Sequence, residues 1–111
     1  MNEEYLGKIV TVQIDRKLGE AHPKFPDCIY KVNYGYIPNT ISGDGEELDA
    51  YILGIDYPVD TFSGEVIAIL RRINDNDDKL IVVEIGKNYS NEEIKEKVKF
   101  VEQYFESIII R

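Results

Sequence analysis

The sequence predicts a mainly β protein of the α+β class, built as a small five-stranded β-barrel with a C-terminal helix. Short runs of β-branched and aromatic residues, separated by turn residues, fill most of residues 8–85. After them the apolar residues recur with a helical period. Five short strands followed by one long helix fit a small barrel closed by that helix. With 111 residues in the chain, we expect a single domain over residues 1–111.

The strand segments are rich in Val, Ile and aromatic residues. The first lies between Gly7 and Asp15, and the second ends before Pro38. The expected strands cover residues 8–14, 29–37, 48–55, 65–73 and 79–85. The expected connections are a polar loop over 15–28, an acidic turn over 39–47, a link over 56–60, a turn at 62–64 and a hairpin-like turn over 74–78.

The helix has a clear start signal. Ser90 and Glu93 form a capping box, in which each side chain can bond to the backbone amide of the other residue. One helical face then carries apolar residues at i, i+4, i+7 and i+11: Ile94, Val98, Val101 and Phe105. We expect the helix to end near Ser107, before the three β-branched residues 108–110.

Acidic residues outnumber basic ones, 21 to 13, and the formal net charge is −8. Nucleic acid is therefore not an expected partner, because phosphate backbones need a basic face. A small phosphate ligand stays compatible with this charge, since metal ions can supply the positive charge.

Cys28 is the only cysteine, so no intramolecular disulfide can form and a reducing compartment is expected. The first residues lack the basic and apolar segments of a signal peptide. No run of residues approaches the roughly 20 apolar residues of a membrane span. We therefore expect a cytoplasmic protein without a membrane partner.

The acidic turn is the most unusual local feature. Asp44, Glu46, Glu47 and Asp49 lie within six residues, and such carboxylates repel one another unless a cation lies among them. Hard oxygen ligands on a short turn suit Mg²⁺, which keeps waters and binds phosphate substrates. A solvated acidic turn is the alternative interpretation of these residues.

The segment around this turn resembles a family signature. Asn-Tyr-Gly-Tyr-Ile-Pro over 33–38, followed by Asp-Gly-Glu-Glu-Leu-Asp over 44–49, resembles the motifs of soluble (family I) inorganic pyrophosphatases. The chain is most similar to short pyrophosphatase-like proteins that open with Ile-Asp-Arg-x-Leu-Gly. The resemblance implies an OB-like five-stranded barrel and hydrolysis of pyrophosphate to two phosphates. The implied cofactor is Mg²⁺, with Mn²⁺ as the alternative.

The resemblance also assigns roles to the acidic residues. Asp44 and Asp49 match family metal ligands, and Glu46 matches the aspartate that helps to deprotonate the attacking water. The family places two further metal-binding aspartates on the connection after the fourth strand. Asp75 and Asp77 match them best, although the shorter loop leaves Asp78 as an alternative to Asp77.

Basic and aromatic residues complete the implied site. Lys79 matches a phosphate-binding lysine, and Arg16 matches an arginine whose guanidinium grips phosphate. Tyr34 matches a tyrosine beside the metals, and Tyr104 a tyrosine that holds phosphate, with simple packing as the alternative for both. His22, the only histidine, is either a further phosphate or metal contact or a surface loop residue.

The chain departs from the family pattern at several positions. Phe105 stands where the family has a lysine, Gln13 where a glutamate is common, and Glu46 is one methylene longer than aspartate; an upstream Lys-Tyr-Glu segment has no counterpart. Three functions therefore stay open: a pyrophosphatase, a phosphohydrolase for another diphosphate, and a non-catalytic protein that binds a metal or a partner. Family members are commonly oligomeric and residues 108–110 are apolar, so we expect a homo-oligomer.

Overall fold

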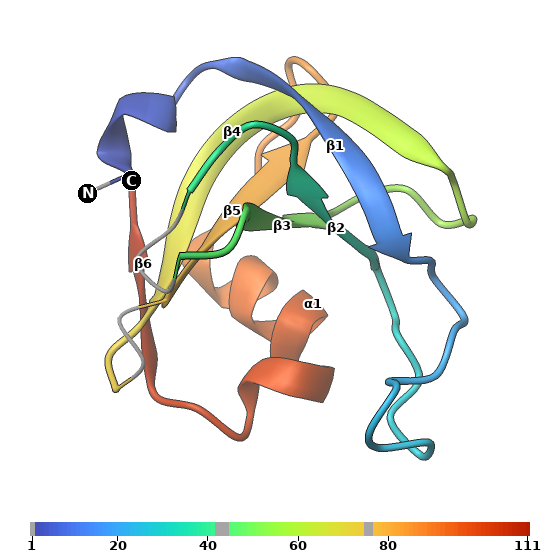
Figure 1. Ribbon diagram of the computed structural model, residues 1–111. Helices are drawn as coiled ribbons and strands as arrows, with labels where there is room; N and C mark the ends of the chain where they lie inside the picture. The colour runs from blue at the N-terminus through green and yellow to red at the C-terminus, as the bar shows by residue number, and fades with distance from the viewer. Residues whose placement is uncertain (1, 42–44, 75–76) are drawn as a thin grey trace.

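The computed structural model describes residues 2–41, 45–74 and 77–111. Within these residues, five strands form a closed ring, with one α-helix packed below it (Figure 1). The strands are β1 (Ile9–Arg16), β2 (Asn33–Ile37), β3 (Leu48–Ile52), β4 (Thr61–Arg72) and β5 (Asp77–Val83), and the helix is α1 (Asn91–Glu102). The expected five-stranded barrel with a C-terminal helix is confirmed.

The ring runs in the order β1-β2-β3-β5-β4 and closes through pairing of β4 with β1. Its pairs are antiparallel except for β3 and β5, which are parallel. A short 3₁₀ turn over Glu3–Tyr5 precedes the barrel. Among the described residues, no helix combines the length and the apolar character that crossing a membrane would need.

Strand β5 is buried along its whole length because it is covered on both faces. Leu80 and Val82 belong to the cluster inside the barrel, whereas Ile81 and Val83 belong to a second cluster beneath α1. Alternation along a strand therefore divides the side chains of β3, β4 and β5 between the barrel interior and the side of the helix. This division positions the functional site.

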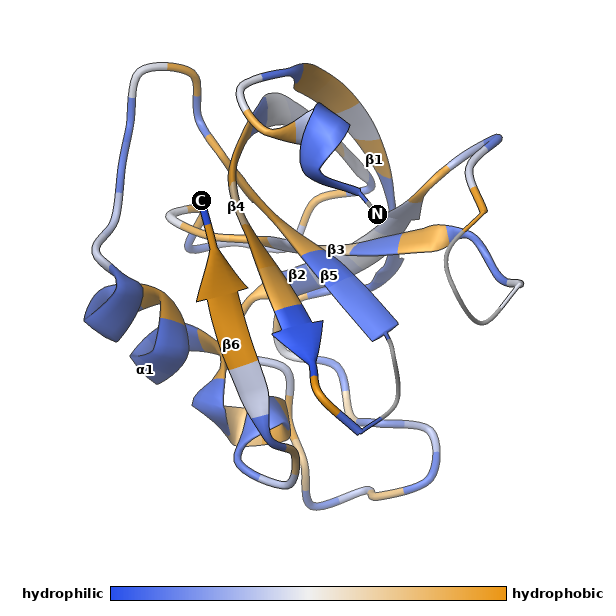
Figure 2. Cartoon of the chain, turned by 90° about the vertical axis from the view of Figure 1, so that its left-hand side faces the viewer, coloured by the Kyte–Doolittle hydropathy of each residue, from blue (hydrophilic) through white to orange (hydrophobic). Residues whose placement is uncertain are grey.

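The helix and the final strand differ from expectation. The capping box of Ser90 is confirmed, but α1 ends at Glu102 and Phe105 lies beyond it. Residues Ser107–Ile110 form a sixth strand, β6, which pairs antiparallel with the second half of β4 outside the ring (Figure 2). β-branched residues favour a strand, and the free edge of the long β4 supplies the partner.

Two further predictions of local structure are wrong. The expected turn at 62–64 lies inside β4, where Gly64 allows β4 and β5 to approach: a Cβ at this position would collide with the Val83 carbonyl oxygen. The expected second strand begins at Asn33 rather than Ile29, which forms only an isolated bridge with Ala21. Residues 17–32 instead form a long loop beside α1 (Figure 1).

Candidate active site

The ends of β3, β4 and β5 present polar side chains on the face that α1 covers. Asp49 points away from the barrel interior because its neighbours Leu48 and Ala50 fill that interior. By the same alternation Asp77 and Lys79 share the helix side of β5. Asp49 and Lys79 are partners in the parallel register of β3 and β5, and Asp77 lies two residues before Lys79 on the same face. The carboxylates of Asp49 and Asp77 therefore meet at Lys79.

Lys79 is the centre of this cluster. Its Nζ lies 2.7 Å from Asp49 Oδ2 and 3.1 Å from Asp77 Oδ2, and it donates a 2.9 Å hydrogen bond to the Tyr34 hydroxyl. Lys79 is only 4% exposed. Burial favours a lower pKa for Lys79, but the interactions with Tyr34 and Asp49 outweigh it and raise the pKa. Lys79 is therefore a fixed positive charge between two carboxylates.

Tyr34 and Arg16 form the adjacent wall. Burial raises the pKa of the Tyr34 hydroxyl well above its ordinary value, so the hydroxyl stays protonated. The Arg16 guanidinium lies 5.5 Å from the centre of the Tyr34 ring and donates a 2.6 Å hydrogen bond to the Tyr30 hydroxyl. Two cations from different strands, Arg16 and Lys79, thus approach the same aromatic ring.

Arg72 is a site residue that the sequence analysis missed. Its guanidinium forms a two-pronged ion pair with Glu102 of α1, at 3.0 and 2.6 Å, and lies 3.6 Å from Asp77. The ring of Phe105 covers it at 3.7 Å, and Tyr51 donates a 2.6 Å hydrogen bond to Glu102. A cation from β4 therefore stands against Phe105, the position at which the resemblance led us to expect a lysine.

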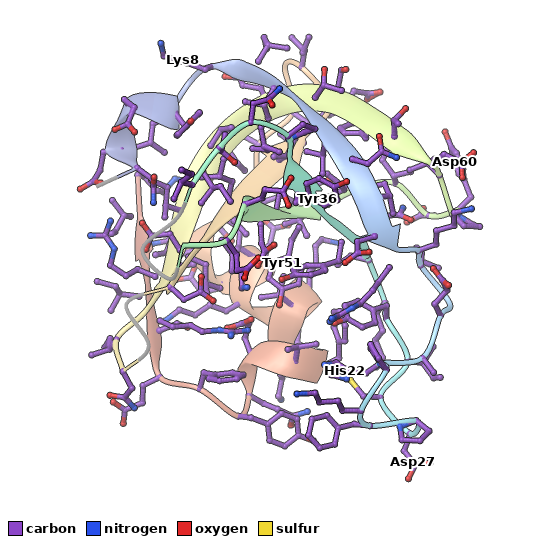
Figure 3. The ribbon with its side chains drawn as sticks, in the orientation of Figure 1. Lys8, His22, Asp27, Tyr36, Tyr51 and Asp60 are labelled. Carbon is purple, nitrogen blue, oxygen red and sulfur yellow. The ribbon has the colours of Figure 1, made fainter. Side chains whose placement is uncertain are left out.

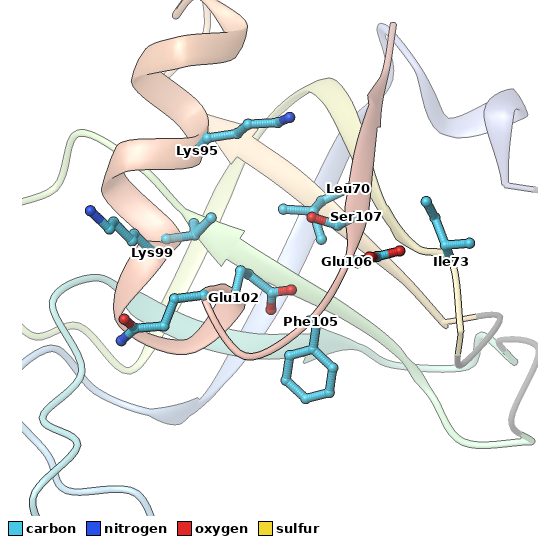
Figure 4. A pocket seen from close by; sticks show the side chains of 10 residues that line it. Leu70, Ile73, Lys95, Lys99, Glu102, Phe105, Glu106 and Ser107 are labelled. Carbon is cyan, nitrogen blue, oxygen red and sulfur yellow. The ribbon is translucent and has the colours of Figure 1, made fainter.

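Figure 4 shows Glu102 and Phe105 at the end of α1, beside a small hollow of about 400 Å³ between the helix and β6. Glu102 projects toward the sheet, where it meets Arg72. The sequence contains a signal for this contact. Ile94, Val98 and Glu102 are spaced four residues apart, so Glu102 lies on the same buried face of the helix as the two apolar residues. A buried carboxylate on an apolar face needs a cation partner.

Asp77 and Asp78 lie on opposite faces of β5. Asp78 receives hydrogen bonds of 2.8 and 2.9 Å from Arg71 and one of 2.9 Å from the Asn2 side chain. It is 2% exposed, and these partners lie on the face away from Lys79. Of the two aspartates left open by the sequence, only Asp77 joins the cluster around Lys79.

The remaining acidic candidates lie on the connecting loops. Asp44 and Asp75 fall outside the described residues. Glu46 is exposed on the loop before β3, and Thr40 ties this loop at its base through the Ile37 carbonyl and the Leu48 amide. Among the described residues, no group of three or more His, Cys, Asp or Glu is placed to hold a metal ion.

A broad cleft of about 1240 Å³ opens from the cluster toward the loop over 17–32 and the end of α1. Tyr104 and His22 both line it. His22 Nδ1 accepts a 3.0 Å hydrogen bond from the Lys24 amide. The pKa of His22 is lowered, mainly by burial and secondly by the positive charge of the nearby Arg16. Figure 3 shows His22 beside α1 and below Tyr51, within the space that the cleft occupies.

Comparison with known proteins identifies the family. The family model for inorganic pyrophosphatase matches residues 6–109. Inorganic pyrophosphatases of Xylella fastidiosa (strain 9a5c) and Xanthomonas campestris pv. campestris are each 34% identical over 68 residues, which is 55% of this chain and 36% of each relative. The chain thus matches little more than a third of the length of these curated relatives.

Solved structures show the same fold. An inorganic pyrophosphatase from Neisseria gonorrhoeae superposes with a TM-score of 0.67 at 22% identity, over 88% of this chain and 74% of that one. One from Ehrlichia chaffeensis gives 0.68 at 19% identity, over 92% and 84%. The expected OB-like barrel is thereby supported. Because the family model covers nearly the whole chain, the chain belongs to the inorganic pyrophosphatase family.

Proposed function

We propose that this protein hydrolyses inorganic pyrophosphate to two phosphates with the help of a divalent metal, Mg²⁺ or alternatively Mn²⁺. The observation that carries the proposal is the meeting of Asp49 and Asp77 at the buried Lys79, at the inner end of a cleft, in a chain of this family. Two carboxylates already gathered around one cation are a donor set that fits a hard divalent ion.

In this proposal Asp49 and Asp77 hold the metal together with Asp44 and Asp75, the two expected ligands outside the described residues. Bound metal would lower the pKa of a water and neutralise charge on the phosphates. Glu46, on the exposed loop before β3, accepts the proton of the attacking water. Thr40 ties the base of this loop and so fixes where the loop leaves the barrel.

The cations and hydroxyls of the cleft hold the phosphoryl oxygens. Lys79 and Arg16 serve this purpose as expected from the sequence, with Tyr34 and Tyr104 as hydrogen-bond donors. We add Arg72, because its planar guanidinium is pre-oriented by Glu102 and covered by Phe105. It supplies a positive charge where Phe105 has replaced a lysine. His22 is retained as a contact at the outer end of the cleft.

Two alternatives remain, and the size of the cleft favours the first of them, a phosphohydrolase for a larger diphosphate. A phosphohydrolase for a larger diphosphate would use the same inner cluster, whereas a non-catalytic binding protein would use the fold alone. We also propose that the chain works as one domain in the cytoplasm, in line with its single cysteine, and as a homo-oligomer.

Phosphate release from pyrophosphate with Mg²⁺ tests the proposal. The parent protein should release phosphate, and Glu46→Gln should lose about 100- to 10,000-fold in turnover while binding pyrophosphate almost normally. Glu46→Asp restores the side-chain length usual in the family and should retain activity. Turnover of Glu46→Gln at the parent rate would remove Glu46 as the base, and an inactive parent would contradict the proposed function.

A further inference from the structure

The cleft concentrates positive charge in an acidic protein. Of the 13 Lys and Arg residues in the chain, six line the described part of the cleft: Arg16, Lys24, Lys31, Arg72, Lys79 and Lys99. Two of these cations, Lys79 and Arg72, are already paired with Asp49, Asp77 and Glu102. The other four face two acidic residues of the described lining, Asp27 and Glu96. Since the formal net charge of the chain is −8, this local excess of four cations over two carboxylates favours an anionic ligand.

Burial divides the cleft into an inner and an outer half. The inner half contains the buried Tyr34, Tyr51 and Lys79 together with Arg16 and Arg72, and under the proposed function these residues hold the two phosphates. The outer half contains exposed cations, Lys24, Lys31 and Lys99. The cleft volume of about 1240 Å³ exceeds the roughly 300–1,000 Å³ of typical small-molecule pockets, and pyrophosphate would fill only its inner end.

The outer half also presents aromatic surface to solvent. Phe25 is 64% exposed and Tyr104 is 75% exposed, and both line the cleft. The His22 ring lies between Phe25, at 5.1 Å, and Tyr30, at 6.1 Å with planes 14° apart. Exposed rings beside cations provide a stacking surface for a flat, electron-rich group.

We propose that the physiological substrate is an organic diphosphate with a planar aromatic group, of the nucleoside diphosphate class. This inference rests on the proposed function, because the same inner cluster performs the hydrolysis. The two phosphates lie at Lys79, Arg16 and Arg72, and the base stacks in the outer half on Phe25. The positive charges of Lys24, Lys31 and Lys99 attract the negatively charged nucleotide toward the cleft.

The reaction is hydrolysis of the phosphoric anhydride. The water oxygen forms a bond to the terminal phosphorus, and the bond from that phosphorus to the bridging oxygen breaks. The bridging oxygen leaves with the nucleoside monophosphate, and the proton of the water passes to the Glu46 carboxylate. The products are orthophosphate and the nucleoside monophosphate, and no oxidant or further reactant is needed.

Steady-state kinetics with ADP, pyrophosphate and geranyl diphosphate, each with Mg²⁺, test the substrate class. ADP should be hydrolysed with a higher kcat/KM than geranyl diphosphate, which has a non-aromatic chain. Phe25→Ala should lower the ratio of kcat/KM for ADP to that for pyrophosphate about 5- to 150-fold, the loss expected for one base–aromatic stack. Tyr57→Ala removes a similarly exposed ring, 62% accessible and outside the cleft, and should leave the ratio unchanged.

Alkylation of Cys28 gives a readout that does not depend on turnover. Cys28 lines the outer half of the cleft, so a non-hydrolysable α,β-methylene analogue of ADP should slow its reaction with iodoacetamide. Methylenediphosphonate should protect it less, and Phe25→Ala should lose the protection by the nucleotide analogue. The two readouts together separate this inference from the proposed function.

Hydrolysis of pyrophosphate without hydrolysis of ADP, and without protection by its analogue, would overturn the inference and leave the pyrophosphatase proposal standing. Protection without hydrolysis of either substrate would keep the nucleotide in the cleft and remove the proposed chemistry. Preference for geranyl diphosphate would overturn the aromatic part of the inference. Absence of both protection and hydrolysis would overturn both proposals.

Discussion

Two ion clusters lie on opposite faces of the same β4–β5 pair, and they are built from adjacent residues. On the helix side, Asp77 contacts Arg72 and Lys79, and these two cations line the inner end of the cleft. On the opposite face, Arg71 and Asp78 pair with each other. Cross-strand register joins Arg72 to Asp77 and Arg71 to Asp78, so a single step along each strand separates the two clusters.

The clusters differ in how their charges are satisfied. Asp78 receives a two-pronged ion pair from Arg71 and a third hydrogen bond from Asn2. Burial favours a higher pKa for Asp78, but these donors outweigh it and lower the pKa. On the cleft face, Asp49 and Asp77 share one ammonium group beside an open cleft. The closed Arg71–Asp78 pair serves the fold, whereas a cluster whose shared cation, Lys79, lines a cleft is suited to binding a ligand.

Asp49→Asn should have the largest effect on activity. Under the proposed function Asp49 is a metal ligand, so loss of its charge should reduce phosphate release from pyrophosphate about 100- to 1,000-fold. The fold should persist, because Lys79 keeps its contacts with Asp77 and Tyr34. Activity is measured by phosphate release and folding by circular dichroism. A folded variant with parent activity would take Asp49 out of the site, and an unfolded variant would make it a structural residue.

Asp78→Asn should have the reverse pattern. Replacing one partner of a buried ion pair typically costs about 3–5 kcal/mol, and we expect the lower end because the Arg71 side chain retains some solvent access. Urea denaturation measures this loss of unfolding free energy. The kcat of the folded variant should match that of the parent. A variant that keeps its stability but loses turnover would break the comparison between the two faces.

Local sequence signals were sufficient for most of the barrel but not for β6. The strands around Val12, Ile52 and Val82 combine β-branched residues with flanking turns, and such patterns do not depend on distant partners. Residues Ser107–Ile110 have an equally strong preference for a strand. Their pairing depends on the free edge of β4, some 40 residues earlier in the chain, which no local pattern reveals.

The site was harder to predict because the strand register decides which side chains lie on the helix side of the sheet. Whether Asp77 or Asp78 meets Lys79 is decided by alternation along β5, and a shift of one residue reverses every side chain. The helical pattern indicates that Glu102 needs a cation partner, but it does not identify Arg72, which lies thirty residues earlier in the chain. The metal-binding roles of all four aspartates stay predictions, and two of them, Asp44 and Asp75, lie outside the described residues.

Added Mg²⁺ should stabilise the parent protein. Binding to the folded state alone contributes about 2.7 kcal/mol at a metal concentration near one hundred times Kd. Asp78→Asn should show the same gain, because its cluster lies on the other face, whereas Asp49→Asn should show little or none. Thermal unfolding with and without millimolar Mg²⁺ measures the difference. An equal gain in all three proteins would place the metal elsewhere.

The pH dependence of stability should be the smallest distinguishing effect, and it belongs to the closed cluster. The pKa of Asp78 is lowered in the folded protein, so its stabilising contribution is present above the ordinary aspartate pKa of about 3.9. This contribution is lost as the pH falls through the lowered pKa, and it amounts to about 1.4 kcal/mol for every tenfold difference in proton affinity between the folded and unfolded chains.

The gap in unfolding free energy between the parent and Asp78→Asn should therefore narrow below about pH 4, since all other carboxylates are common to both proteins. Urea denaturation from pH 6 down to the acid limit of folding measures this gap. A gap that stays constant across that range would mean that Asp78 has the same pKa in the folded and unfolded chains, and the closed pair would then contribute through packing rather than through charge.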